Sequence, residues 1–115
     1  MSDWTDDILR HFPTVLRRWD GSIARMWELT TSHRTLRLRL EQPGRVGNLV
    51  IGCLDPEFIK GPTEWRDSHV QITRESDGFS IRDQRVGVDV RAGHVELAEN
   101  ATPLNAFTVT SGRTG

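Results

Sequence analysis

The chain has 115 residues, of which 27% are charged and 36% are hydrophobic, and its formal net charge is −1. This length predicts one domain, and the balanced charge argues against a dedicated nucleic-acid-binding protein with a basic surface. No apolar run reaches the ~18 residues of a membrane span, and the acidic N-terminus lacks the apolar stretch of a secretory signal. The only cysteine, Cys53, excludes an intramolecular disulfide, so we expect a soluble protein of a reducing compartment, the cytoplasm.

The first segment has the spacing of a helix. Apolar residues recur there at intervals of three and four, which is the spacing of one helical face: Trp4, Ile8, Leu9, Phe12, Val15, Leu16 and Trp19. Pro13 removes a helical hydrogen bond and its ring clashes with the preceding turn. We therefore expect the helical region 1–19 to be a kinked pair, with a helix over 3–11 and a second turn over 13–19.

From Ser22 onward the hydrophobic period changes to that of strands. A hairpin over 23–30 and 35–41 pairs Leu29 with Leu36, and it pairs neighbouring residues in the same register: Glu28 with Arg37 and Trp27 with Leu38. We expect Trp19 and Trp27 to lie in the core. A turn over 42–45 leads to a strand over 48–54 that is apolar on both faces, which is typical of a central, covered strand.

Residues 55–67 interrupt the alternation, and we expect an irregular excursion there. Asp55-Pro56-Glu57 has the pattern of a helix start, and three bulky residues anchor the segment: Phe58, Ile59 and Trp65. Two more hairpins are predicted, 69–75 with 79–83 and 85–91 with 94–99. The second has a defect, because its two-residue loop places Asp89 opposite Glu96, and like charges at opposing positions are unfavourable.

These elements predict an α+β, mainly β domain over residues 1–99. An N-terminal helix or kinked helix pair packs on a strongly bent antiparallel meander sheet, or open barrel, of about seven strands over 22–99. Residues 100–115 form a tail that we expect to be partly disordered, and Ala106–Val109 within it is able to add a short strand or to dock on the helix.

The sequence contains no recognisable catalytic or cofactor motif. No phosphate-binding loop is present, and the four histidines lack the spacing of metal ligands, so we expect no catalytic residue, no metal and no cofactor: His11, His33, His69 and His94. Cys53 in an apolar strand is expected to behave as a small buried hydrophobe. Carboxylates and basic groups do gather in the 55–67 segment and next to it, where they either cap a solvated loop or serve acid–base chemistry: Asp55, Glu57, Glu64, Arg66, Asp67 and His69.

Arginines gather in the first hairpin. Residues 21–50 hold five arginines against two acids, a local charge of +3: Arg25, Arg34, Arg37, Arg39 and Arg45 against Glu28 and Glu41. Arg37 and Arg39 share the outer face of one strand, which either recognises an anionic partner or is simply a solvated face with ion pairs. The candidate binding residues are the arginines of this face and three residues of the 55–67 segment: Arg25, Arg37, Arg39, Glu64, Trp65 and Arg66.

The leading helix, the Trp19-Asp20-Gly21 turn into the sheet and the meander together resemble the architecture of small bacterial proteins, some toxin-immunity proteins among them. The resemblance rests on no diagnostic motif and assigns no residue a role. The lack of a catalytic or cofactor signature, the single domain and the charged sheet faces favour a non-enzymatic protein-binding module, immunity- or adaptor-like, acting through a sheet face or the 55–67 segment. Two alternatives stay open: a small-ligand binder or enzyme using the concave sheet face, and a weak nucleic-acid binder using the arginine-rich face. We expect a protein partner and no membrane, and a homo-oligomer is compatible with the sequence.

Overall fold

The computed structural model describes residues 3–32 and 34–100, with side chains from residue 10 onward. The elements within these residues are, in chain order, α1 (Asp3–Arg18), β1 (Ile23–Thr30), β2 (Thr35–Glu41), β3 (Asn48–Lys60), β4 (Glu64–Trp65), β5 (Gln71–Glu75), β6 (Gly78–Asp83), a 3₁₀ turn (Gln84–Val86) and β7 (Val88–Asn100). The tail over 101–115, with its expected strand, lies outside the described residues.

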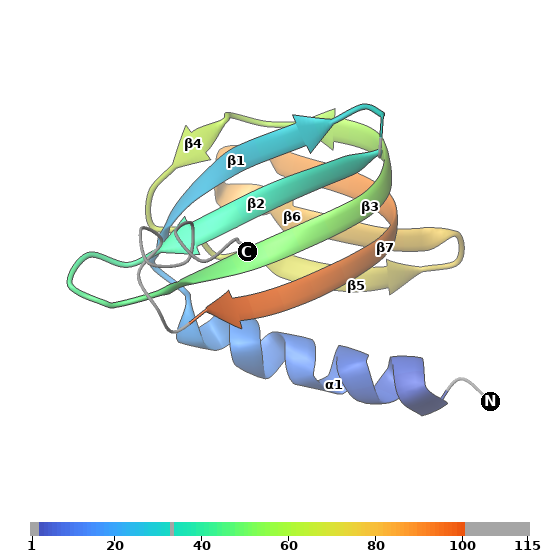
Figure 1. Ribbon diagram of the computed structural model, residues 1–115, viewed down its shortest axis with the longest axis horizontal. Helices are drawn as coiled ribbons and strands as arrows, with labels where there is room; N and C mark the ends of the chain where they lie inside the picture. The colour runs from blue at the N-terminus through green and yellow to red at the C-terminus, as the bar shows by residue number, and fades with distance from the viewer. Residues whose placement is uncertain (1–2, 33, 101–115) are drawn as a thin grey trace.

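The described strands form one antiparallel sheet with the order β4-β1-β2-β3-β7-β6-β5. Two meanders, β1-β2-β3 and β5-β6-β7, are joined where the long strands β3 and β7 pair. The sheet curls into a half-barrel, and α1 runs beneath it next to β5 (Figure 1). The α+β, mainly β fold class predicted from the sequence is therefore confirmed.

The core fills the inside of the curled sheet. Side chains of a strand alternate between the two faces, and the inward set from β2 and β3 is almost fully buried: Leu36, Leu38, Leu40, Leu49, Ile51 and Cys53. Val90 and Val95 of β7 meet them from the next strand. Burying each large aliphatic side chain contributes roughly 1.5–3 kcal/mol, so this alternation holds the central strands together.

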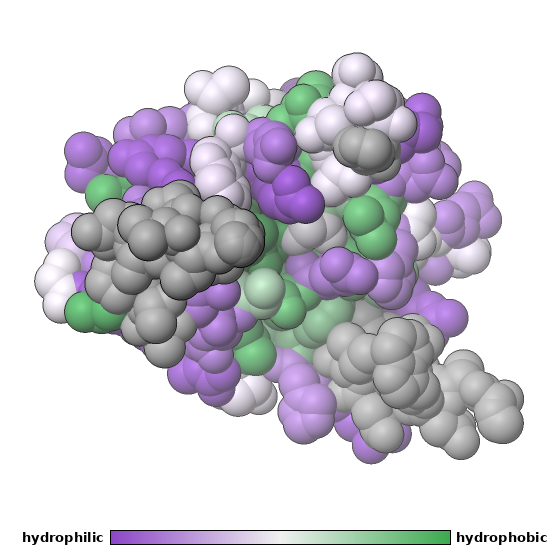
Figure 2. All heavy atoms as spheres, in the orientation of Figure 1, coloured by the Kyte–Doolittle hydropathy of each residue, from purple (hydrophilic) through white to green (hydrophobic). Residues whose placement is uncertain are grey.

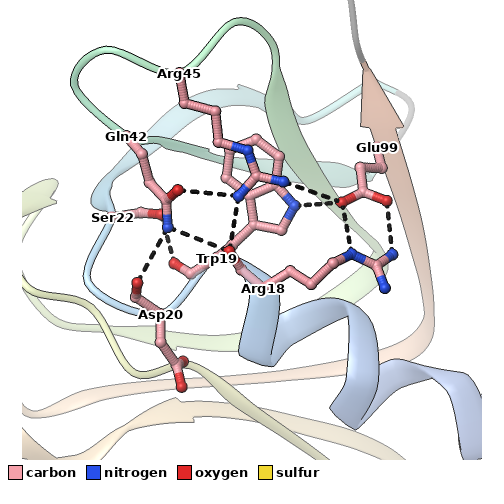
Figure 3. A network of polar contacts seen from close by, with 7 residues as sticks. All are labelled: Arg18, Trp19, Asp20, Ser22, Gln42, Arg45 and Glu99. Carbon is pink, nitrogen blue, oxygen red and sulfur yellow. Dashed lines mark hydrogen bonds and ion pairs between the residues drawn. The ribbon is translucent and has the colours of Figure 1, made fainter.

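The helix is continuous through Pro13, so the expected break after residue 11 is wrong. Proline costs the helix one hydrogen bond, but Phe12, Leu16 and Trp19 are all buried against the sheet and hold the turns on both sides of it. Helix ends leave carbonyl groups without partners. Here the carbonyl oxygen of Arg18 accepts hydrogen bonds from Arg45 Nη1 at 2.7 Å and Gln42 Nε2 at 3.3 Å (Figure 3).

The first hairpin has the predicted register at its tip, with Leu29 opposite Leu36 and Glu28 opposite Arg37. Further along it differs, because Met26, and not Trp27, faces Leu38 across a β-bulge between Met26 and Glu28. A bulge inserts one unpaired residue and re-aims its side chain. Trp27 is consequently 43% exposed and not part of the core, while Trp19 is 1% exposed and buried as expected.

The strand β3 does not end at Leu54. It continues with a bulge between Pro56 and Phe58 as far as Lys60, so the first half of the predicted irregular excursion is strand and no helix begins at Asp55. Residue Asp55 itself has a left-handed backbone, with φ of 59°. Pairing with β7 over Ile59 and Lys60 supplies the backbone hydrogen bonds that local sequence does not predict.

The last predicted hairpin is wrong as well, because Val88–Asn100 is one uninterrupted strand. Asp89 therefore never meets Glu96. It lies opposite Lys60 on β3 and Arg82 on β6, and an ion pair joins it to Arg82 at 3.4 Å. The unfavourable pairing of Asp89 with Glu96 was therefore a sign that no hairpin forms at Ala92-Gly93.

The hairpin of β5 and β6 follows the prediction, with Ile72 opposite Ile81. Gly78 closes its turn with φ of 148°, and a Cβ there would lie 2.4 Å from the carbonyl oxygen of Ala92. Only glycine fits such a close approach of two backbones.

Among the described residues, α1 is neither long enough nor apolar enough to span a membrane.

Candidate functional site

Two segments face each other at the tip of the first hairpin. The chain over 55–64 leaves its pairing with β2 at one end and joins β1 at the other, so it arches over the hairpin tip. At the first end the amide of Asp55 donates to the carbonyl of Arg34 at 2.7 Å, and at the second the amide of Met26 donates to the carbonyl of Thr63 at 2.7 Å. Between these two bonds, no described backbone group of the tip (residues 26–34) is hydrogen-bonded to the arch (residues 55–64), although the side chains of Arg34 and Asp55 form an ion pair.

Large hydrophobic side chains gather along this unpaired stretch. Of six exposed large hydrophobic residues in the described chain, four lie on the tip and the arch, and we call them the apolar rim: Trp27, Leu29, Phe58 and Ile59. Leu29 and Ile59 lie opposite the buried residues Leu36 and Val90 in their ladders, so they belong to the inward-facing rows. Leu29 and Ile59 are nevertheless exposed. At Leu29, β1 pairs only with β2 among the described strands, and at Ile59, β3 pairs only with β7.

The guanidinium group of an arginine lies over each aromatic ring of the apolar rim. The guanidinium of Arg39 lies 4.7 Å from the centroid of Trp27, and that of Arg91 lies 5.6 Å from the centroid of Phe58. Both distances fall within the ~6 Å over which a cation attracts an aromatic face. Arg39 is the more buried, with 15% of its side chain exposed, and its Nε has no hydrogen-bond partner. The rim thus presents aromatic faces and guanidinium groups together.

The arch is protected against strand pairing. Beyond Leu54 the ladder to β2 ends, so Asp55–Lys60 pairs only with β7 among the described strands. Proteins blunt such edges with prolines, bulges and lysines, and this edge has Pro56, a bulge and Lys60, which is the only lysine of the chain. The side chains of the rim, and not its backbone edge, are therefore the accessible feature of this segment.

Three of the candidate binding residues lie in one ion-pair network on the outer face of the sheet. Arg25 contacts Glu41 at 3.0 Å and Glu64 at 3.1 Å, and Arg39 lies 3.7 Å from Glu41. Arg37 pairs separately with Glu28 at 2.5 Å. Figure 2 shows hydrophilic side chains over much of this face, with hydrophobic ones between them. Each such exposed pair stabilises the fold by only ~0–1 kcal/mol. The pairs nevertheless place carboxylates next to the arginines, so the arginine charge here is largely balanced by neighbouring acids.

The other two candidates lie apart from this network. Trp65 is 6% exposed, and its indole donates to the buried carboxylate of Asp83 at 2.9 Å. Arg66 is exposed and has no hydrogen-bond or ion-pair partner among the described residues. Trp65 therefore anchors the chain after the arch, and Arg66 is a free cation beside it.

The carboxylates considered for acid–base chemistry are not brought together. Asp55 pairs with Arg34, Glu64 with Arg25 and Asp67 with Arg85. Glu57 lines a separate hollow beside the β5–β6 turn. His69 lies 3.7 Å from both Asp20 and Asp67. Within the described residues, no group of three or more histidine, cysteine or acidic side chains is arranged to hold a metal ion.

Cys53 is fully buried, and burial in the apolar interior raises the pKa of its thiol to about 12. The thiolate is the nucleophilic form of cysteine, so this side chain is inert at neutral pH and serves packing. His69 is not placed to act as a base for this thiol, because it lies in the loop before β5, whereas Cys53 is enclosed by the core cluster.

Sequence reasoning missed the apolar rim. The alternating pattern predicts Trp27 in the core because it does not reveal a bulge. Arg91 is predicted at the end of a strand, before a turn that the structure does not contain. The expectation that Phe58 and Ile59 anchor the 55–67 segment is wrong, because both are exposed, and of the three bulky residues only Trp65 is buried. Comparison with known proteins finds no matching family model, no similar curated sequence and no similar solved structure.

Proposed function

We propose that this protein is a non-enzymatic protein-binding module, immunity- or adaptor-like, that meets its partner through the apolar rim. The observation that carries the proposal is the concentration of four exposed large hydrophobic side chains on facing segments of the tip and the arch. Exposed large hydrophobic side chains gathered at one edge of a small domain are a mark of interaction sites. Here they lie on both faces of that edge, because Ile59 is opposite the buried Val90 and Phe58 is opposite the exposed Arg91.

The composition of the rim supports the same conclusion. Tryptophan and arginine are enriched among the residues that dominate binding energy at protein interfaces, and here Arg39 and Arg91 each lie over an aromatic ring of the rim. A guanidinium held against a ring loses less side-chain freedom when a partner binds. The partner expected from this chemistry is a protein surface with an apolar centre and carboxylates at its margin.

The two other functions have less support. The arginine face lies beside four acids, which reduces its attraction for nucleic acid: Glu28, Glu41, Glu64 and Glu96. The acids considered for catalysis are dispersed over separate ion pairs. A cytoplasmic location is part of the proposal, and it draws support from the single unpaired thiol of Cys53.

Site-specific photo-cross-linking in the native cell tests the proposal. A photoreactive phenylalanine analogue replaces Phe58 in one variant and Val46 in a matched control, because Val46 is 62% exposed and lies outside the rim. We expect a discrete protein adduct from position 58 and none from position 46. Adding purified wild-type protein or a Val46→Ala variant to the lysate before irradiation should abolish the adduct, whereas a Phe58→Ala variant should not. Equal adducts from both positions, or none, would contradict the proposal.

A further inference from the structure

A recess lies between α1 and β5. It has a volume of about 440 Å³, within the ~300–1,000 Å³ of ligand-binding clefts. Its lining comes from the second half of the helix, from Asp20 after it, and from residues 69–73, which include the start of β5. We name this recess the α1/β5 groove.

The groove faces the edge of β5 and not one of its faces. Successive strand residues point to opposite faces, so a recess along one face would be lined by every second residue. This one is lined by three consecutive residues of β5, Gln71, Ile72 and Thr73, and by the two loop residues before them. β5 is also the last strand of the sheet and pairs only with β6 among the described strands. Its backbone N–H and C=O groups on the groove side therefore lack a ladder.

The side chains of the groove complement one kind of occupant. Leu16 and Val70 are buried and Ile72 is half-buried, which gives an apolar floor. Arg17 is exposed on the helical wall and has no ion-pair partner among the described residues. Asp20 and His69, 3.7 Å apart, close one end. Unlike the arch, the middle of this edge, Ile72 and Thr73, has no proline, bulge or lysine to prevent pairing.

We propose that the α1/β5 groove binds an extended peptide segment of a partner protein, which adds as an eighth strand to the edge of β5. Strand addition supplies affinity through backbone hydrogen bonds and specificity through pockets for alternate side chains. The peptide places an aliphatic side chain over Leu16, Val70 and Ile72 and a carboxylate against Arg17. This site is separate from the apolar rim and does not depend on it.

A displayed library of random nine-residue peptides is the probe. Peptides selected on the wild-type protein are measured against Gln71→Trp and Thr73→Trp, two variants at exposed lining positions where a tryptophan fills the groove. Tryptophan is favoured in strands, so both variants should fold, and circular dichroism checks this. We expect acidic, aliphatic peptides that lose at least tenfold in affinity for both variants.

Two controls separate strand addition from other modes of binding. Arg17→Gln should weaken the selected acidic peptides at least threefold, whereas Arg66→Gln, which removes an equally unpaired cation outside the groove, should not. Two copies of the best peptide carry N-methyl groups at the two alternate sets of backbone nitrogens. One copy should lose binding and the other should keep it, because only every second N–H of an added strand donates to its neighbour. Failure to select any peptide, unchanged binding to the tryptophan variants, or full binding of both methylated copies would each overturn the proposal. Cross-linking from the apolar rim is unaffected by these outcomes.

Discussion

The indole nitrogen of Trp19 donates a hydrogen bond to the carboxylate of Glu99 at 2.6 Å and so joins the residue after α1 to the end of β7. Arg18 holds the same carboxylate from the other side with bonds of 2.8 and 3.2 Å, and the guanidinium of Arg45 stacks 3.7 Å from the centroid of Trp19 (Figure 3). The C-terminal end of α1 and the end of β7 are thereby fixed to one another.

We predict that Trp19→Phe lowers the free energy of unfolding by about 1.5–3 kcal/mol, the usual contribution of a hydrogen bond to a charged group. The phenyl ring keeps most of the buried apolar surface, so the variant should remain folded. Urea unfolding followed by circular dichroism measures the loss. An unchanged free energy of unfolding would show that the indole bond to Glu99 does not contribute to stability.

The same carboxylate predicts a pH dependence. The hydrogen bond from Arg18, with help from Trp19 and the charge of Arg45, holds the pKa of Glu99 below its ordinary value of 4.5, although partial burial opposes this. A group with a lowered folded-state pKa contributes stability above the unfolded value, and that contribution is lost as the pH falls through the folded one. Wild type should therefore exceed Glu99→Gln in stability at pH 7, and the difference should shrink below pH 4.5. A difference that stays constant with pH would contradict the assignment.

We predict a larger loss of stability when the carboxylate of Asp83 is removed than for the Trp19 and Glu99 variants. Its carboxylate is fully buried, and Oδ2 accepts hydrogen bonds from the indole of Trp65 at 2.9 Å and the amide of His69 at 2.8 Å. Asp83→Ala leaves both donors buried without an acceptor, at a cost of roughly 1–3 kcal/mol for each. Asp83→Asn keeps one oxygen as an acceptor and should cost less. Because asparagine has nearly the volume of aspartate, equal destabilisation by the two variants in urea unfolding would show that a retained acceptor oxygen does not reduce the loss, which would contradict this account.

Cys53 should react slowly with thiol reagents. With its thiol buried and its pKa raised to about 12, the reactive thiolate is scarce in the folded protein. We expect labelling by a chromogenic disulfide reagent to be slow under native conditions and fast in denaturant. Rapid native labelling would mean that β3 opens readily or that the thiol is accessible.

Replacement of Arg37 and of Arg39, on the outer face of β2, should change the stability of the protein by different amounts. Arg37 forms an exposed pair with Glu28, so Arg37→Gln should change stability within about 0.5 kcal/mol, as surface substitutions usually do. Arg39 is mostly buried and stacks on Trp27, an interaction of about 0.5–1 kcal/mol or more when desolvated. Arg39→Gln should therefore be the more destabilising, by thermal unfolding. Equal effects would indicate that Trp27 is not held by Arg39.

The sequence was informative where structure is local. Alternation over Leu36, Leu38 and Leu40 identified β2, and the Ser76-Asp77 turn identified the β5–β6 hairpin, because both signals arise within a few residues. The same reasoning failed for β7, since Ala92-Gly93 has the composition of a turn and only pairing with β3 and β6 keeps it extended. Long-range pairing overrode local propensity there, as it often does in sheets.

The candidate site was predicted only in outline. The segment over 55–67 was identified because it broke the alternation, but its strand character and its position over the hairpin tip follow from contacts with distant residues. Whether Trp27 faces the core or solvent is decided by one bulge, and shifting a strand by a single residue exchanges its faces. Residues such as Trp27 and Arg91 are therefore recognisable only in three dimensions.

Isothermal titration of the protein that cross-links from position 58 gives the most direct measurement of rim binding. Wild type is compared with Trp27→Ala and Phe58→Ala in the rim, and with Val46→Ala and Val86→Ala, which alter exposed hydrophobic residues elsewhere. Truncation of a dominant interface residue costs at least about 2 kcal/mol, or roughly thirtyfold in affinity. We predict a loss of that size for at least one rim variant and none for the two control variants. Wild-type affinity in both rim variants would contradict binding through the apolar rim.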